Sequence, residues 1–255
     1  MTTGHDFWDI AIPTFSGVIG ALAGGVPSYF LARRASKEVL ERDREARRDA
    51  EKSAAQRVFV KLGIITNSLL GFRGQIREMI ERAERDGRAD MPLSMRLSTF
   101  AGIERETTPD FAADELAMFV AAGKIGYVDD LILLQRRHRA IVDGLATFAK
   151  MRVDLHYRTA GVGTTTRDEA GVSRTVAHVP TDVANRLKVE AEELELYTRA
   201  LLEMLDEYAA FAERVADDYG AHVRGYFGDP TMPRFARKGE AVGQGDEGVG
   251  EDGTG

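Results

Sequence analysis

Apolar residues recur at helical spacing along three long stretches of the chain. In each stretch the apolar positions follow one another in steps that alternate between three and four residues, which is the heptad spacing of helices that pack along one seam. The seams are Val58, Leu62, Ile65, Leu69, Phe72, Ile76, Met79 and Ala83; Leu131, Leu134, His138, Ile141, Leu145, Phe148, Arg152 and Leu155; and Leu187, Ala191, Leu194, Thr198, Leu201, Leu205, Tyr208, Ala212, Val215 and Tyr219. The spacing predicts an antiparallel helical bundle or coiled coil over residues 58–225, with seams that pack within one chain or between two.

Glycine and proline residues indicate where helices begin and end within residues 58–225. Gly87 is a plausible end for the first seam helix, and Gly123 ends a shorter apolar helix. The run Thr108-Pro109-Asp110 predicts the start of that shorter helix, with Thr108 as N-cap. Alternating apolar residues over 91–97 suggest a short extended piece in the connector.

Two segments break the helical period. Residues 159–180 are rich in Gly, Thr and Val, which fits either a small β-hairpin or an irregular loop. Residues 226–255 end in a Gly-rich and acidic stretch that buries too little apolar surface to order itself, so we expect a disordered tail. The expected fold class is therefore all-α with one short insertion.

The stretch Ile10–Ala32 contains no charged residue and is long enough to cross a bilayer as a helix. We therefore expect residues 10–32 to be a transmembrane helix. Two alternatives are a secretory signal peptide cleaved after Ala23 and a buried core helix. The first lacks a basic region before the apolar stretch, and the second would not need a segment without a polar face.

Charge is distributed unevenly around this stretch. Residues 1–9 contain no Lys or Arg, whereas Arg33, Arg34 and Lys37 follow the apolar stretch directly. Since positive charge near a span stays on the cytoplasmic side, we expect a single-pass protein of the inner (cytoplasmic) membrane with its N-terminus outside. The basic residues would face anionic lipid. Residues 33–57 lack an apolar stripe and carry opposite charges at helical spacing, so we expect a charged helical stalk.

Small residues are regularly spaced within the apolar stretch. Gly20 and Gly24 form a GxxxG pair, and Gly17, Ala21 and Gly25 continue a small-residue series on a neighbouring face. Such spacing lets two membrane helices approach closely, so a homodimer through the span is one expectation. The alternative is chance spacing in a glycine-rich span.

Composition excludes several classes of function. A net charge of −7 argues against a general nucleic-acid binder. Because the chain has no cysteine, disulfides, thiolate metal sites and cysteine nucleophiles are excluded.

Few residues offer catalytic chemistry. The five histidines are scattered and lack the paired spacing of a helical metal site, and no phosphate-loop or hydrolase motif occurs, so no catalytic, cofactor-binding or metal-binding residue is expected. His138 is the one histidine on a seam. It is either a hydrogen-bonded core residue that fixes register or a polar switch that responds to pH.

These observations favour a non-enzymatic role. We expect a membrane-anchored helical protein that acts by protein–protein contact, as a scaffold or tether for a cytoplasmic partner. The alternative is a membrane-linked sensor or effector in a bacterial stress or phage-defence pathway.

Overall fold

The computed structural model describes the backbone of residues 6–100, 103, 106–160, 164–167, 173–176 and 180–235. Side chains are described in the same ranges from Tyr29 onwards, except for those of residues 161–179. The chain divides into two units, residues 1–53 and residues 54–255. Helix α1 (Asp6–Arg85) contributes to both.

In the first unit, α1 is a solvated helix where its side chains are described. Every residue from Tyr29 to Ala50 is exposed. Ion pairs one turn apart join Arg34 to Glu38 at 3.1 Å and Arg47 to Glu51 at 3.3 Å. Such pairs stabilise a helix in water without a buried face.

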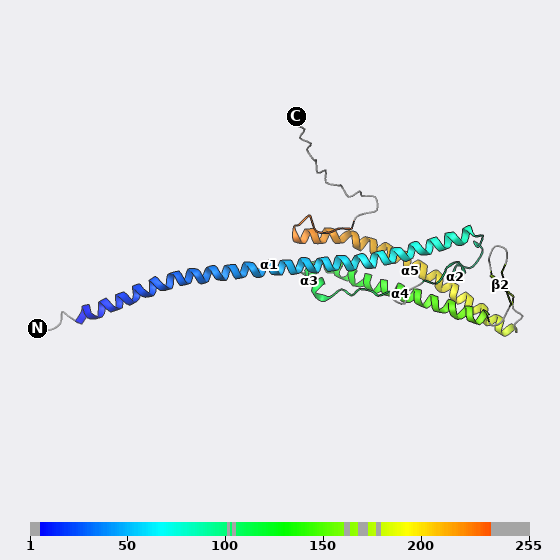
Figure 1. Ribbon diagram of the computed structural model, residues 1–255, viewed down its shortest axis with the longest axis horizontal. Coiled ribbons are helices and arrows are strands. Elements are labelled where there is room, and N and C mark those ends of the chain that lie inside the picture. The colour runs from blue at the N-terminus through cyan, green and yellow to red at the C-terminus, as the bar shows by residue number, and fades with distance from the viewer. Residues whose placement is uncertain are drawn as a thin grey trace, which may run out of the picture. The chain divides into compact units, whose positions relative to one another are not determined.

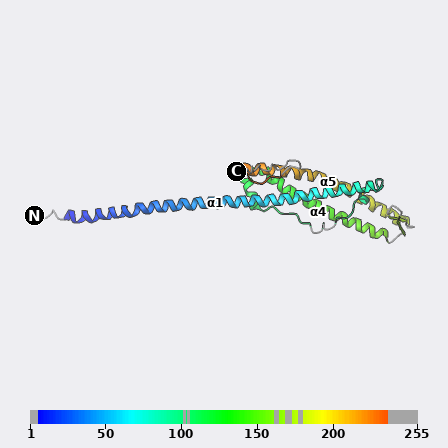
Figure 2. The ribbon, with the colours of Figure 1, turned by 45° about the horizontal axis from the view of Figure 1, so that its top comes forward.

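In the second unit, the later part of α1 lies beside α4 (Ile125–Ala160) and α5 (Thr181–Phe227), as Figures 1 and 2 show. Helix α5 is antiparallel to α1, because the Tyr219 hydroxyl donates to the carbonyl of Ala55 while Arg77 reaches Asp206. The main expectation from the seams, a helical bundle, is confirmed.

Helices α1 and α4 run in the same direction, which differs from the fully antiparallel arrangement expected. The connector after α1 carries the chain back along the bundle before α4 begins, so α4 follows the direction of α1. Helix α5 then returns against α4, with Tyr127 bonded to the carbonyl of Val215 and Arg158 paired with Glu190. A long crossover of this kind is a known alternative to short bundle loops.

The three seams form the core. Most of their members are buried, including the polar seam residues His138 and Thr198. Burial begins at Ala54 and Ala55, three and two residues before the predicted end of the stalk at residue 57. Small side chains let α5 approach α1 here, since the Tyr219 hydroxyl reaches the Ala55 carbonyl at 2.6 Å.

Two short helices lie in the connector between α1 and α4. Helix α2 (Leu93–Arg96) is a single turn, where the alternation of apolar residues had suggested an extended piece. Its turn buries Ser94 and is followed by the buried Leu97. Helix α3 (Ala113–Ala121) ends at Gly123, which adopts a left-handed backbone with φ of 69°. Gly87 does the same after α1 with φ of 74°, so both predicted helix ends are confirmed.

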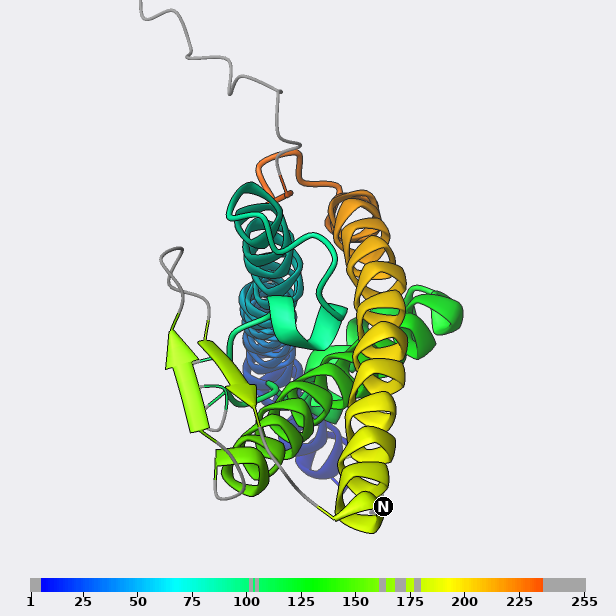
Figure 3. The ribbon, with the colours of Figure 1, turned by 90° about the vertical axis from the view of Figure 1, so that its right-hand side faces the viewer.

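The insertion between α4 and α5 contains two short strands (Figure 3). Strand β1 (Thr164–Arg167) pairs antiparallel with β2 (Ser173–Val176). Of the two expected alternatives for this segment, the structure has the hairpin.

The chain remains packed on the bundle beyond the predicted start of the tail at residue 226. Helix α5 continues to Phe227, and Gly228 caps it in the left-handed conformation with φ of 61°. Met232 is 7% exposed, and Phe235 packs against the core. The apolar residues Phe227, Met232 and Phe235 explain the order of this segment, whereas residues 236–255 lie outside the described part of the chain.

Candidate functional site

The candidate site is built around His138, the polar residue predicted on the second seam. Its side chain is 0% exposed. The Nδ1 atom lies 2.8 Å from the Thr108 hydroxyl, and Nε2 lies 3.0 Å from the Ser68 hydroxyl. Ser68 in turn donates to a carboxylate oxygen of Glu106 at 3.0 Å. The cluster joins α1, the connector and α4.

A neutral imidazole satisfies all of these contacts. The Ser68 proton points to Glu106, so the Ser68 oxygen accepts from His138 Nε2–H. The Nδ1 atom then accepts from the Thr108 hydroxyl. In this arrangement both nitrogens of His138 are paired.

This pattern of hydrogen bonds differs from that of a Ser–His–acid catalytic triad. In such a triad the carboxylate orients the imidazole and the imidazole takes the serine proton. Here the carboxylate of Glu106 binds Ser68 itself, and the imidazole donates to that serine. In this arrangement the cluster links α1, the connector and α4.

Burial has an electrostatic consequence for His138. Removing the imidazole from water lowers its pKa below the ordinary value of 6.5, while the nearby charge of Glu106 partly opposes that shift. The neutral form is therefore favoured in the folded protein.

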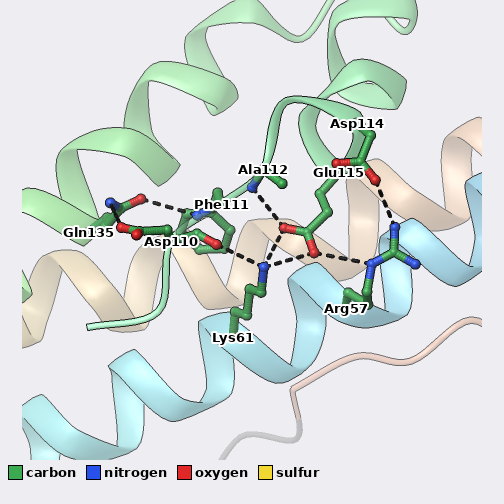
Figure 4. A network of polar contacts seen from close by, with 8 residues as sticks. All are labelled: Arg57, Lys61, Asp110, Phe111, Ala112, Asp114, Glu115 and Gln135. Carbon is green, nitrogen blue, oxygen red and sulfur yellow. Dashed lines mark hydrogen bonds and ion pairs between the residues drawn. The ribbon is translucent and has the colours of Figure 1, made fainter. Parts of the chain in front are cut away.

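A second polar cluster lies at the start of α3 (Figure 4). The carboxylate of Glu115 is 3% exposed and accepts hydrogen bonds from three groups: Lys61 Nζ at 2.7 Å, the Ala112 backbone N–H at 2.9 Å and Arg57 Nε at 3.1 Å. Arg57 also reaches Asp114 at 3.0 Å. Two cations from α1 thus converge on one buried anion of α3.

The hydrogen bonds of Glu115 outweigh the effect of its burial. Burial raises the pKa of a carboxyl group, yet the donors Lys61, Ala112 and Arg57 together hold the pKa of Glu115 below its ordinary value of 4.5. The carboxylate is ionised and fully engaged. We call this set, Arg57, Lys61, Ala112 and Glu115, the Glu115 clamp.

The predicted N-cap of α3 is wrong. Helix α3 begins at Ala113, after Ala112 as the flanking residue, rather than at Thr108. The Thr108 hydroxyl binds His138, and the Asp110 carboxylate accepts from Gln135 at 2.6 Å and from Arg139 at 3.1 Å. Since α4 holds both side chains, neither is available to cap a helix.

A third polar group surrounds α2. The Glu195 carboxylate accepts from the backbone N–H of Ser94 at 2.9 Å and pairs with Arg199. Burial of Glu195 opposes ionisation, but these hydrogen bonds hold its pKa below 4.5. A depression of about 480 Å³ lies beside it, lined by Asp90, Met91, Pro92, Leu93, Arg96, Glu195 and Arg199. Its arginines are engaged, because Arg199 pairs with Glu195 and Arg96 pairs with Glu84.

The other residues singled out from the sequence belong to the first unit and are not members of these clusters. Arg33, Arg34 and Lys37 are exposed in the first unit. The small residues Gly17, Gly20, Ala21, Gly24 and Gly25 lie where side chains are outside the described part of the structure.

Among the residues whose side chains the structure describes, from Tyr29 onwards, no helix has an apolar stretch long enough to cross a membrane. Nor do the described ranges bring together three His, Asp or Glu side chains that would hold a metal ion.

Sequence reasoning missed both partners of His138 and the whole Glu115 clamp. Ser68 and Lys61 flank seam positions on α1, and Glu115 belongs to a short helix whose start was misplaced. Periodicity identifies apolar faces and carries no information about which polar residues meet. The position of His138 on an apolar seam was the one feature of the sequence that pointed to a buried polar cluster.

Comparison with models of protein families, with curated proteins and with solved structures gave no match.

Proposed function

We propose that this protein is a membrane-tethered helical protein that acts through protein contacts rather than through catalysis. Residues 1–9 lie outside the membrane, residues 10–32 span it, and the stalk and bundle lie in the cytoplasm. The charge asymmetry around residues 10–32 supports this orientation.

The observation that carries the proposal is the continuity of α1. One helix, Asp6–Arg85, contains the uncharged stretch, the charged stalk and the first seam of the bundle. A bundle whose first core helix extends into a membrane span is anchored without a separate linker.

The chemistry of the clusters favours a contact role. In the His138 cluster and the Glu115 clamp, the buried polar groups bind one another across α1, the connector, α3 and α4. Such groups fix the positions of helices, and their hydrogen-bonding capacity is already used. Exposed apolar side chains on α5, such as Val189 and Leu196, offer surface to a protein partner.

Cysteine accessibility tests this proposal, since the chain has no native cysteine. Thr2→Cys and Ser53→Cys are made separately, and intact cells are treated with a membrane-impermeant thiol reagent. We expect labelling of Thr2→Cys alone, with Ser53→Cys labelled only after lysis. Labelling of Ser53→Cys in intact cells would contradict the proposed orientation and reject a cytoplasmic scaffold.

A sensor or effector role is a second candidate, favoured by the His138 cluster. This buried cluster connects α1 directly to the connector and α4, so a movement of α1 would reach both. Gly20→Leu and Gly24→Leu in the membrane-inserted protein should then change amide exchange in residues 106–112 at equal abundance. Ala23→Leu is the matched control, and equal exchange in all three variants would reject signal transmission through α1.

A further inference from the structure

The segment after α5 forms a strap over the bundle, which we call the C-terminal strap, residues 228–235. It begins where Gly228 ends α5 with its N–H bonded to the carbonyl of Arg224. Thr231 and Met232 then form a local turn on Asp229. The strap is irregular rather than helical or extended into a sheet.

The side chains of Met232 and Phe235 attach the strap to the helices. The Phe235 ring lies 4.5 Å from the Phe59 ring of α1 and 6.2 Å from the Tyr219 ring of α5, measured between centroids. These are the spacings of favourable aromatic pairs. Met232 is buried three residues earlier.

Two glycines make room for the strap. A Cβ on Gly63 of α1 would lie 3.4 Å from the Phe235 ring, and a Cβ on Gly220 of α5 would lie 2.9 Å from the Cβ of Arg234. Any side chain at Gly220 would therefore displace the strap. The groove is shaped by glycines from two helices.

The wall of the groove is held independently of the strap. The Tyr219 hydroxyl donates to the Ala55 carbonyl at 2.6 Å, and the ring packs on Phe59 and Phe119. These contacts involve only the helices. The aromatic slot formed by Phe59, Gly63, Tyr219 and Gly220 would keep its shape after the strap leaves.

We propose that this slot is a peptide-docking site, closed in the free chain by its own strap and opened to a partner segment of the same chemistry. The strap itself defines the ligand: an irregular segment with a methionine, an aromatic residue three positions later, and a proline and a basic residue between them, as in Met232-Pro233-Arg234-Phe235. The proposal rests on the protein-contact role above but not on the membrane tether.

The strap competes with any partner segment for the slot, so partner binding at this site is regulated. A short covalent link gives the strap an effective concentration of roughly millimolar order at its own slot. A partner segment must therefore exceed that competition, or the strap must first be released. Emptying the slot should strengthen binding of an external peptide by about tenfold.

The test uses a fluorescent peptide of residues 228–238 and the full chain in mild detergent, with binding followed by anisotropy. The double variant Met232→Ala/Phe235→Ala should bind the peptide about tenfold more tightly than wild type. Adding Gly63→Leu to the double variant should abolish binding, as should replacing Phe235 by Ala in the peptide. Equal binding to wild type and double variant, or binding to neither, would overturn the proposal.

A second measurement uses a variant in which the residues of the slot and the anchoring side chains of the strap are unchanged. A spin label on Thr231→Cys reports strap mobility, because Thr231 is exposed and the chain has no other cysteine. Saturating peptide should mobilise the label, and an unchanged spectrum would overturn displacement. If wild type instead forms a dimer that Phe235→Ala abolishes, the occupant is a second copy and the partner proposal is rejected. None of these results depends on which side of the membrane the bundle lies on. A failure of the proposed orientation in the cysteine-accessibility test can therefore be told apart from a failure of the docking site.

Discussion

The two parts of α1 are stabilised by different forces. In the part of the stalk that belongs to the first unit, residues 33–53, the side chains are exposed or partly exposed, and charged pairs such as Arg34–Glu38 bridge one helical turn. In the bundle part, Leu62, Ile65 and Leu69 are completely buried. Neighbouring turns of one helix are thus held by solvent-screened charge in one part and by packing in the other.

The comparison shows how little of this helix depends on any one stalk residue. An exposed ion pair contributes a few tenths of a kcal/mol, whereas one buried leucine contributes several times more. Substitutions in the stalk should therefore be tolerated, and substitutions in the bundle should not.

Leu62→Ala should lower the free energy of unfolding by about 2–5 kcal/mol, because the truncated side chain leaves a cavity in the core. Leu40→Ala, in the stalk, should change it by no more than about 0.5 kcal/mol, since Leu40 is exposed. Urea denaturation followed by circular dichroism measures both. Equal effects would show that the stalk packs as tightly as the bundle.

Glu115→Gln should cost about 1–3 kcal/mol, because Lys61 and Arg57 lose the charge that both of them bind. Glu38→Gln in the stalk should cost at most about 0.5 kcal/mol. Since the pKa of Glu115 is lowered on folding, its contribution is present above pH 4.5 and is lost as the pH falls below that value. Urea midpoints from pH 3 to pH 7 should converge for wild type and Glu115→Gln at the acid end; a constant gap would contradict the assignment.

Gly144→Ala should destabilise the bundle by about 1–3 kcal/mol, because the new Cβ would lie 2.6 Å from Leu201 Cδ1 in the core. Gly74→Ala is the control on α1, where no atom lies within 4 Å. It should stabilise the protein by about 0.5–1 kcal/mol through helix propensity alone. Thermal unfolding should give shifts of opposite sign, and two shifts of the same sign would refute the close α4–α5 contact.

His138→Leu should flatten the pH dependence of stability near neutrality. Since folding lowers the pKa of His138, its neutral form supports the fold above pH 6.5, and stability falls as the pH drops below that value. The slope is at most about 1.4 kcal/mol per pH unit, because one group exchanges one proton. The exposed His156→Leu serves as control, and unfolding free energies measured between pH 5 and pH 8 should differ between the two variants. A profile unchanged in His138→Leu would eliminate the switch.

The seams could be predicted because burial imposes a period on the sequence. Leu131, Leu134, Ile141 and Leu145 follow the helical repeat of α4, and all are buried. The helix ends at Gly87 and Gly123 could be predicted for a different reason, since each of these glycines has a left-handed backbone that other residues rarely adopt.

Polar partners and helix directions could not be predicted in this way. Thr108 has the sequence features of an N-cap, but its hydroxyl contacts His138, thirty residues later in the chain. The parallel course of α1 and α4 depends on the path of the connector, and the short alternation of apolar residues over 91–97 does not indicate that path. Phe235 follows a proline and a basic residue in a stretch without repeat, so its packing on Phe59 left no trace in the sequence.

The hydrogen bond between Tyr219 and Ala55 also constrains how the protein is made. The two residues are separated by 164 positions, so the first seam must wait for the last helix to be synthesised. At about 5–20 residues per second, the ribosome needs roughly 8–30 s to cover that interval. During this time the apolar face of α1 lacks its final neighbour, and a nascent chain of this protein is expected to engage a holding chaperone until α5 emerges.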